Sequence, residues 1–139
     1  ESYMSSGQDG ALCMWKETQK KPIATIPAAH GVEASGARWV SAMASMKASD
    51  LVATGSNDGF LRFWHADADD RELSEMTKWE VGKGFVNSIA ISPRLVVIGT
   101  GNEHRMGRWW RERGAKNRVE VFNLGDLVTD AEFKDREVR

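Results

Sequence analysis

Short runs in which apolar and polar residues alternate recur along the chain, separated by residues typical of turns. Alternation with a period of two predicts β-strands that bury one face. Between residues 30 and 81, four such runs follow one another: Trp39 to Ser45, Leu51 to Ser56, Phe60 to Trp64 and Leu73 to Val81. We therefore predict an all-β fold, in which Pro22 to Ala28 is the outer strand of a preceding unit.

One segment occurs twice. Ser5 to Trp15 reads SSGQDGALCMW and Thr54 to Trp64 reads TGSNDGFLRFW, at an offset of 49 residues without a gap. Each copy has an Asp-Gly turn, in which we expect both central residues to have positive φ, followed by a strand ending in Trp. A repeat near this length with four strands per unit is the signature of a WD-repeat β-propeller blade.

A third copy follows, with strands expected over Phe85 to Ser92, Leu95 to Thr100 and Val119 to Phe122, and with Phe122 in the place of Trp. Residues 1–29 are then the end of one blade, 30–81 a complete blade, 82–124 the last blade, and 125–139 a C-terminal tail. We interpret the chain as a fragment that holds about three C-terminal blades of a propeller expected to have seven.

Each blade of this kind is held by a buried hydrogen-bonded chain. Its expected members are His30, Thr54 (or Ser56), Asp58 and Trp64, with Asp9 and Trp15 as the equivalents in the first copy. A His, an Asp and a hydroxyl group also suggest a nucleophilic triad. The blade pattern favours the structural interpretation, because a buried carboxylate and imidazole must be paired. We therefore expect no enzyme activity. The last blade has no preceding His and no Asp-Gly turn, so we expect the buried hydrogen-bonded chain to be absent from that blade.

About 13 residues are inserted before the third strand of the last blade, and they concentrate positive charge in one segment. The chain carries a net charge of −1, yet residues 103–118 hold six Arg or Lys against two Glu. Two adjacent tryptophans interrupt this basic run, which predicts a phosphate-binding surface with Trp as a stacking plate. The candidate RNA- or partner-binding residues are His104, Arg105, Arg108, Trp109, Trp110, Arg111, Arg113, Lys116 and Arg118. In the alternative interpretation, one Trp anchors the loop, and the arginines pair with acids on neighbouring blades or on a protein partner.

Other features of the composition narrow the class of protein. No apolar run approaches the roughly 18 residues needed to span a membrane. A lone Cys13, without a cluster of Cys or His, predicts neither a disulfide nor a metal site. We expect no cofactor, no metal and no small-molecule substrate.

The insert also carries the most specific resemblance. The string from Gly101 to Arg111 (GNEHRMGRWWR), the following AKNR, and the upstream GFVNS starting at Gly84 resemble the WD-repeat proteins of the U3 small nucleolar ribonucleoprotein. The resemblance covers about residues 51–124. It implies a non-enzymatic nucleolar protein that binds the box B/C region of the U3 small nucleolar RNA together with a small kink-turn-binding protein.

The same resemblance implies contacts with other proteins of the small-subunit processome and a role in pre-rRNA processing. The alternative hypothesis is a WD-repeat protein–protein scaffold, such as a ubiquitin-ligase substrate receptor or a peptide-reading adaptor. Such a scaffold does not need the basic insert, and its binding should depend only weakly on salt, whereas RNA binding weakens steeply with salt.

Overall fold

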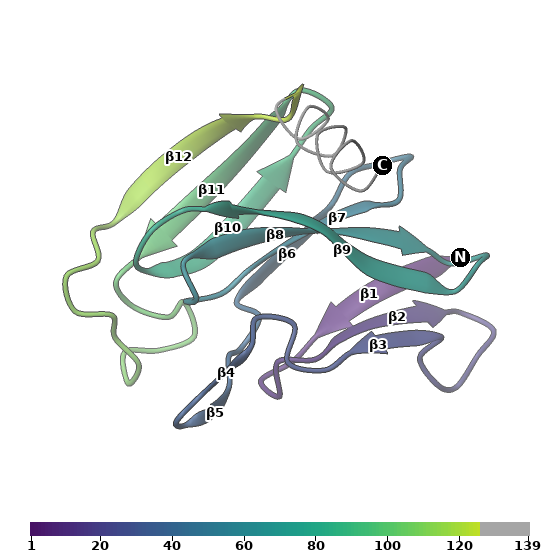
Figure 1. Cartoon of the computed structure of the whole chain (residues 1–139), viewed down its shortest axis with the longest axis horizontal. Coiled ribbons are helices and arrows are strands. Elements are labelled where there is room, and N and C mark those ends of the chain that lie inside the picture. Colours follow the sequence, from purple (N-terminus) through teal and green to yellow (C-terminus); the bar gives the residue numbers. More distant parts are fainter. Residues whose placement is uncertain (126–139) are drawn as a thin grey trace, which may run out of the picture.

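The computed structural model describes residues 1–125 of the chain. Three antiparallel sheets stand next to one another, and a small two-stranded hairpin projects beside them (Figure 1). The predicted all-β fold is confirmed. None of the described residues belongs to a helix long and apolar enough to cross a membrane.

The middle sheet is the complete four-stranded unit. Its strands are β6 (Ala42–Ser45), β7 (Leu51–Gly55), β8 (Phe60–Asp67) and β9 (Glu72–Glu80). They lie in the order β6-β7-β8-β9, as a meander in which each strand pairs with the next along the chain. The first strand begins three residues later than predicted. Trp39 lies before this strand, and its ring packs edge-on against His104 and Trp110 of the insert.

The flanking sheets have three strands each. One contains β1 (Ser2–Ser6), β2 (Leu12–Lys16) and β3 (Ala24–Ile26), and the other contains β10 (Phe85–Ile91), β11 (Leu95–Gly101) and β12 (Arg118–Asn123). The strand register reproduces the sequence repeat. Trp64 lies opposite Val52, Trp15 opposite Tyr3, and Phe122 opposite Val96. Phe122 therefore occupies the position of the repeat Trp.

The middle sheet has a hydrophobic core on each side. Ala53, Leu61 and Phe63 pack with Val86, Val96 and Ile98 of the last sheet. Val52, Trp64 and Leu73 pack with Leu12 and Met14 of the first sheet. Alternate residues of β7 and β8 thus enter opposite cores, which explains the period-two pattern of the sequence.

The middle and last sheets approach each other closely at Gly55. A Cβ atom at this position would lie 2.4 Å from Cγ1 and 2.5 Å from Cβ of Val86. Real Cβ atoms do not come this close to other heavy atoms, so a side chain here would force the two sheets apart. Glycine at position 55 is therefore a packing requirement between blades.

The Asp-Gly turns differ from the prediction. Gly10 and Gly59 have φ of 73° and 86°, but Asp9 and Asp58 are not among the residues with positive φ. The expectation of two positive φ angles is wrong, because four residues instead of two connect β7 to β8. In each turn the Asp Oδ1 accepts the amide two residues later, at 3.0 Å from Ala11 N and 3.2 Å from Phe60 N. This is an Asx turn, which Asp9 and Asp58 form without adopting a positive φ.

A hairpin that was not predicted joins the first sheet to the middle one. It consists of β4 (Val32–Glu33) and β5 (Gly36–Ala37), two residues each. Strands this short show no alternation of apolar and polar residues, so the pattern gave no signal. Figure 1 places the hairpin at the same end of the sheets as the connection between β11 and β12.

Candidate functional site

Four side chains of the complete blade form one continuous polar chain. Trp64 Nε1 donates to Thr54 Oγ1 at 2.8 Å, and Thr54 Oγ1 lies 2.8 Å from His30 Nε2. His30 Nδ1 lies 3.0 Å from Asp58 Oδ2. Because the Asp58 carboxylate can only accept, the His30 proton belongs on Nδ1, toward Asp58, and Nε2 accepts from the Thr54 hydroxyl.

The geometry of this polar chain indicates a structural role and not a catalytic one. Thr54 is fully buried and has hydrogen-bond partners on both sides, so its oxygen is not open to a substrate. Ser56, the other hydroxyl considered, donates instead to the Trp39 carbonyl at 2.6 Å. A nucleophile needs an accessible oxygen beside its base, and neither hydroxyl provides one.

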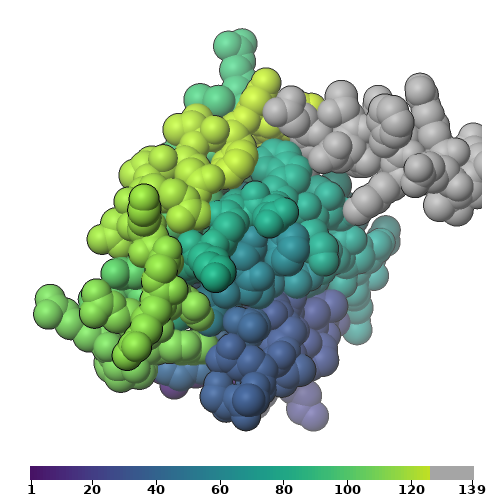
Figure 2. Space-filling model, turned by 60° about the vertical axis from the view of Figure 1, so that its left-hand side comes forward, coloured from purple at the N-terminus to yellow at the C-terminus, as the bar shows by residue number. Residues whose placement is uncertain are grey.

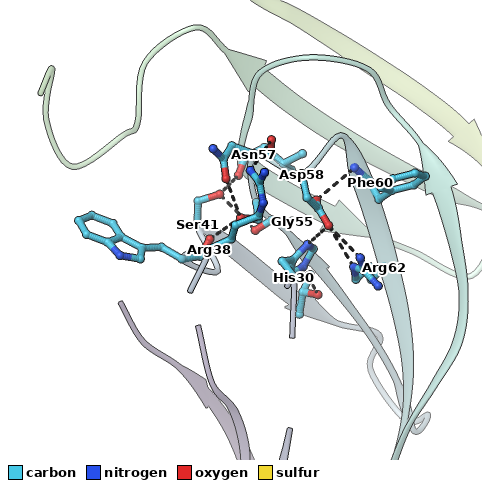
Figure 3. A network of polar contacts seen from close by, with 12 residues as sticks. His30, Arg38, Ser41, Gly55, Asn57, Asp58, Phe60 and Arg62 are labelled. Carbon is cyan, nitrogen blue, oxygen red and sulfur yellow. Dashed lines mark hydrogen bonds and ion pairs between the residues drawn. The ribbon is translucent and has the colours of Figure 1, made fainter. Parts of the chain in front are cut away.

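Asp58 joins the buried chain to the surface of the blade. Figure 3 shows its carboxylate between His30, Arg62 and the Phe60 amide. Burial raises the pKa of Asp58, but His30, then Arg62 and the Phe60 N–H, outweigh this effect and hold the pKa below its ordinary value. Arg62, which the sequence pattern did not single out, lies 3.0 Å from Asp58 and 2.8 Å from Glu75.

The first copy of the repeat keeps only part of this chain. Trp15 Nε1 donates to Ser5 Oγ at 2.8 Å, which repeats the bond from Trp64 to Thr54. Asp9 is exposed and accepts the Ala11 amide, and no His contacts it within residues 1–125. The two copies thus share the Trp–hydroxyl bond but differ in the burial of their Asp.

The insert between β11 and β12 is an ordered loop. Glu103 and Arg111 form a β-bridge, and the Glu112 amide donates to the Asn102 carbonyl at 2.8 Å. The Asn87 side chain of β10 holds one arm: its Nδ2 donates to the Glu103 carbonyl at 2.8 Å and its Oδ1 accepts the Arg105 amide at 3.1 Å. Backbone groups of the insert are therefore fixed by a side chain of its own blade.

An aromatic cluster anchors the insert to two blades. The Trp110 ring lies edge-on to Trp39 of the middle blade and to Phe85 of β10, each with a centroid distance of 5.2 Å. His104 lies in the same cluster, 5.2 Å from Trp39 and 5.5 Å from Phe85, and it is buried. Of the two adjacent tryptophans, Trp110 is the anchor.

His104 serves the loop as a neutral ring. Burial, and then the charge of Arg105, lower the pKa of His104. Its Nδ1 accepts the Met106 amide at 3.1 Å, which requires that this nitrogen be unprotonated. A neutral His104 is therefore consistent both with its hydrogen bond and with its burial among aromatic rings.

The structure divides the predicted site residues into two groups. Arg118 is internal to the fold, since its guanidinium contacts Glu120 and the carbonyls of Val81 and Lys83. His104 and Trp110 are in the anchor. The exposed residues are Arg105, Arg108, Trp109, Arg111, Arg113 and Lys116. Glu103 is 3.7 Å from both Arg108 and Arg111, so it offsets part of their charge.

The exposed group stands beside the β4–β5 hairpin. Figure 2 shows the insert, in green, as a ridge next to the blue surface of the hairpin region. A shallow cleft runs between them, lined by acidic and basic side chains that include Glu33, Arg38, Glu80, Lys83 and Glu112. Sequence reasoning missed this cleft because its residues come from five separate segments of the chain.

One group of potential metal ligands comes together elsewhere. Atoms of Asp50, His65 and Asp67 lie within 4.8 Å of one another. Asp67 Oδ1 already accepts the amides of Asp69 and Asp70, at 2.8 and 3.0 Å. These bonds hold the turn between β8 and β9, so the group has a structural explanation.

Comparisons with known proteins agree with this architecture. No protein-family model matches the chain. Over 134 residues it is 37% identical to the mouse protein (Mus musculus) named U3 small nucleolar RNA-interacting protein 2, which covers 91% of the chain and 28% of the mouse protein. It is 33% identical over 148 residues to the rice protein (Oryza sativa subsp. japonica) named U3 snoRNP-associated protein-like YAOH, covering 89% of the chain and 29% of that relative.

Two solved structures are similar to the chain. They are described as the crystal structure of RRP9 WD40 repeats and the structure of U3-55K, each with a TM-score of 0.81 and 34% identity. Each match covers 88% of this chain, and 38% or 39% of the solved chain. The blades seen here are therefore WD-repeat propeller blades, as the repeat predicted.

Within that class, the chain is a homologue of the WD-repeat proteins associated with the U3 small nucleolar ribonucleoprotein. The resemblance carried by the Arg-Trp-Trp-Arg string is thus confirmed. The chain spans between a quarter and a third of the length of these curated relatives.

Proposed function

We propose that this chain is part of a non-enzymatic component of the U3 small nucleolar ribonucleoprotein, and that its insert binds the U3 RNA. The observation that carries the proposal is the construction of the insert. Its base is fixed by Trp110, His104 and Asn87, while its arginine tips are free of the blade. The Arg108 and Arg111 side chains are 90% and 59% exposed. Fixed backbone with exposed Arg is suited to phosphate, which Arg binds with a planar pair of donors.

The finer assignments follow from the relatives' names and from the resemblance. We infer that the RNA segment is the box B/C region, bound together with a small kink-turn-binding protein. We also infer contacts with other processome proteins, location in the nucleolus, and a role in pre-rRNA processing and small-subunit assembly. Two relatives are named as U3 RNA-interacting or U3 ribonucleoprotein-associated, which supports this placement.

The test uses the full-length protein that contains these blades. Arg105, Arg108 and Arg111 are replaced together by Ala, and recovery of the U3 RNA is measured over a salt series. We expect weaker recovery and a shallower salt dependence. A variant that contacts fewer phosphates releases fewer counterions when it binds the RNA. Melting should barely change, since exposed ion pairs contribute only about 0–1 kcal/mol each.

A charge-matched control separates specific from general effects. Lys20, Lys21 and Lys47 are exposed outside the insert, and replacing all three by Ala removes the same charge. We expect this variant to recover RNA like the unmodified protein. Equal recovery by both triple variants at every salt concentration would reject the insert as the RNA-binding surface.

The competing function is a protein–protein scaffold, and one observation favours it. The mixed-charge cleft lined by Glu33, Arg38 and Glu112 suits a peptide that carries both charges. If the insert variant kept its RNA but lost protein partners, with little salt dependence, the scaffold function would be the better description.

A further inference from the structure

Trp109 differs from every other tryptophan of the chain. All six lie within residues 1–125, and Trp109 is the only one that is exposed, at 68% of its surface. Its neighbour Trp110 already supplies the anchor of the loop. The folded blades therefore do not need the Trp109 ring for a core, although an exposed indole ring is costly in contact with water.

The exposed ring is nevertheless fixed in place. A Cβ atom at Gly107 would lie 1.7, 2.2 and 2.5 Å from Cζ3, Cε3 and Cη2 of Trp109. The six-membered part of the indole thus lies directly on the backbone of Gly107, in space that any other residue would fill. Gly107 has an ordinary φ, so its missing side chain is needed for the ring and not for the turn.

The Trp109 ring therefore forms a flat aromatic plate with one face supported by the protein. One side of the ring rests on Gly107, and most of its surface faces solvent. Three exposed arginines belong to the same loop: Arg108 is the chain neighbour of Trp109, and Arg105 and Arg111 lie within four residues of it along the chain. An open aromatic face among cations that can hold phosphate is the arrangement with which proteins bind single-stranded nucleic acid, because every base has a face to stack.

A paired base cannot use this plate. Inside an RNA duplex both faces of each base are covered by its neighbours, so aromatic side chains stack on unpaired bases in loops, bulges and single-stranded ends. A plate of this kind distinguishes an unpaired base from a paired one, and not one sequence from another. A pocket-filling protein anchor would instead be surrounded by apolar residues, whereas Met106 is the only other exposed large apolar residue of the insert, residues 103–118.

We propose that Trp109, backed by Gly107, stacks on one unpaired base of the bound RNA, while the neighbouring arginines hold its phosphates. This inference rests on the proposed function, since it requires that the insert bind RNA. It adds the class of ligand, an unpaired nucleotide, and assigns a specificity for single strands to one side chain.

The first experiment compares two RNA probes with the full-length protein. One is a short single-stranded RNA of mixed sequence, and the other is a blunt duplex of the same length. We expect Trp109→Ala to weaken single-strand binding by roughly 5- to 150-fold, the effect of losing one stacked base. Trp109→Phe should keep most of the affinity. Duplex binding and the salt slope should stay unchanged in both variants, because no charge is lost.

The second experiment tests the support beneath the ring. Gly107→Ala should displace Trp109 and weaken single-strand binding in the same direction as Trp109→Ala. In a protein that already carries Trp109→Ala, Gly107→Ala should have no further effect, because there is no ring to displace. This double-mutant cycle isolates the contact between the two residues. Melting curves of all four proteins should coincide within a few degrees.

The outcomes separate the two proposals. If the unmodified protein binds RNA with a steep salt slope and Trp109→Ala binds as well as it does, the stacking inference is rejected and the RNA function survives. If the unmodified protein shows no salt-dependent RNA binding, both are rejected. Loss of a protein partner by Trp109→Ala, with RNA binding intact, would identify the plate as a protein contact and overturn the inference.

Discussion

Asn57 Nδ2, in the turn between β7 and β8, donates to Glu112 Oε1 of the insert at 3.1 Å. The turn that carries the blade's Asp58 is therefore joined to the far arm of the basic loop. Asn87 holds the near arm from β10. The insert is thus braced by two blades, and its exposed arginines project from a fixed base.

Replacing Asn57 by Ala should loosen this arm of the insert. One hydrogen bond to a carboxylate is lost, which is worth about 1.5–3 kcal/mol when both groups are well ordered. The expected result is faster tryptic cleavage at the arginines of the insert, with only a small fall in melting temperature. Gln8→Ala, which removes an exposed amide from the β1–β2 turn, is the control. Equal cleavage rates in the two variants would mean that Asn57 does not restrain the loop.

The two copies of the repeat should respond differently to the same substitution. Asp58→Ala leaves Nδ1 of the buried His30 without its partner and should cost about 1–3 kcal/mol. Asp9→Ala removes only an exposed turn bond and should cost less than half as much. Trp64→Ala opens a cavity between two blades and should cost roughly 3–5 kcal/mol. Denaturant unfolding of the full-length protein measures all three. A cost for Asp9→Ala as large as that for Asp58→Ala would contradict the difference in burial.

Stability should also depend on pH through Asp58. Its folded pKa is lowered, so the group stabilises the fold above its unfolded pKa, about 3.9, and this stability is lost as the pH falls through the lower folded value. Asp58→Asn removes this titration. We expect the variant to be less stable than the unmodified protein near neutral pH, and the gap to narrow below about pH 4. Parallel stability curves from pH 6 to 3 would show that Asp58 has no favourable ionic contacts in the fold.

Two glycines, Gly55 in β7 of the middle sheet and Gly99 in β11 of the last sheet, offer a matched test of packing between blades. At Gly55 a Cβ would meet Cβ and Cγ1 of buried Val86, whereas at Gly99 it would meet only the Ser88 hydroxyl, at 2.6 Å. The Ser88 side chain is exposed and can rotate away, but Val86 is fixed in the core. Gly55→Ala should therefore destabilise by roughly 1–3 kcal/mol and Gly99→Ala by much less. Neither position needs positive φ, so backbone strain does not confuse the comparison.

Most of the fold could be predicted from the sequence because the repeated alternation of apolar and polar residues shows which face of each strand is buried. Trp64 and Phe122 align from the residue pattern alone, since alternation places them on one face of equivalent strands. The hairpin formed by β4 and β5 escaped detection because two-residue strands have no period. The two positive φ angles expected at Asp58-Gly59 were wrong because sequence does not reveal the length of the turn.

The sequence predicted which residues form the candidate site, but it did not predict which of their side chains are buried and which are exposed. Charge and resemblance both marked residues 103–118. Neither could say that His104 is buried against Phe85, or that the Arg118 guanidinium contacts the carbonyl of Val81 in the preceding connection. Those contacts join segments far apart in sequence. Adjacent residues such as Trp109 and Trp110 look alike in a sequence, and only packing separates them.

That difference gives the last prediction. Trp110 packs on Trp39 and Phe85, while Trp109 rests on Gly107 and is mostly exposed. Trp110→Ala should lower the stability of the blades by about 1–3 kcal/mol, because it removes aromatic contacts between two of them. Trp109→Ala should change stability by less than about 0.5 kcal/mol, as expected for a surface position. Denaturant unfolding of the two variants under identical conditions measures the contrast. Equal losses would show that both rings belong to the anchor, whereas a larger loss for Trp109 would reverse the assignment of the two residues.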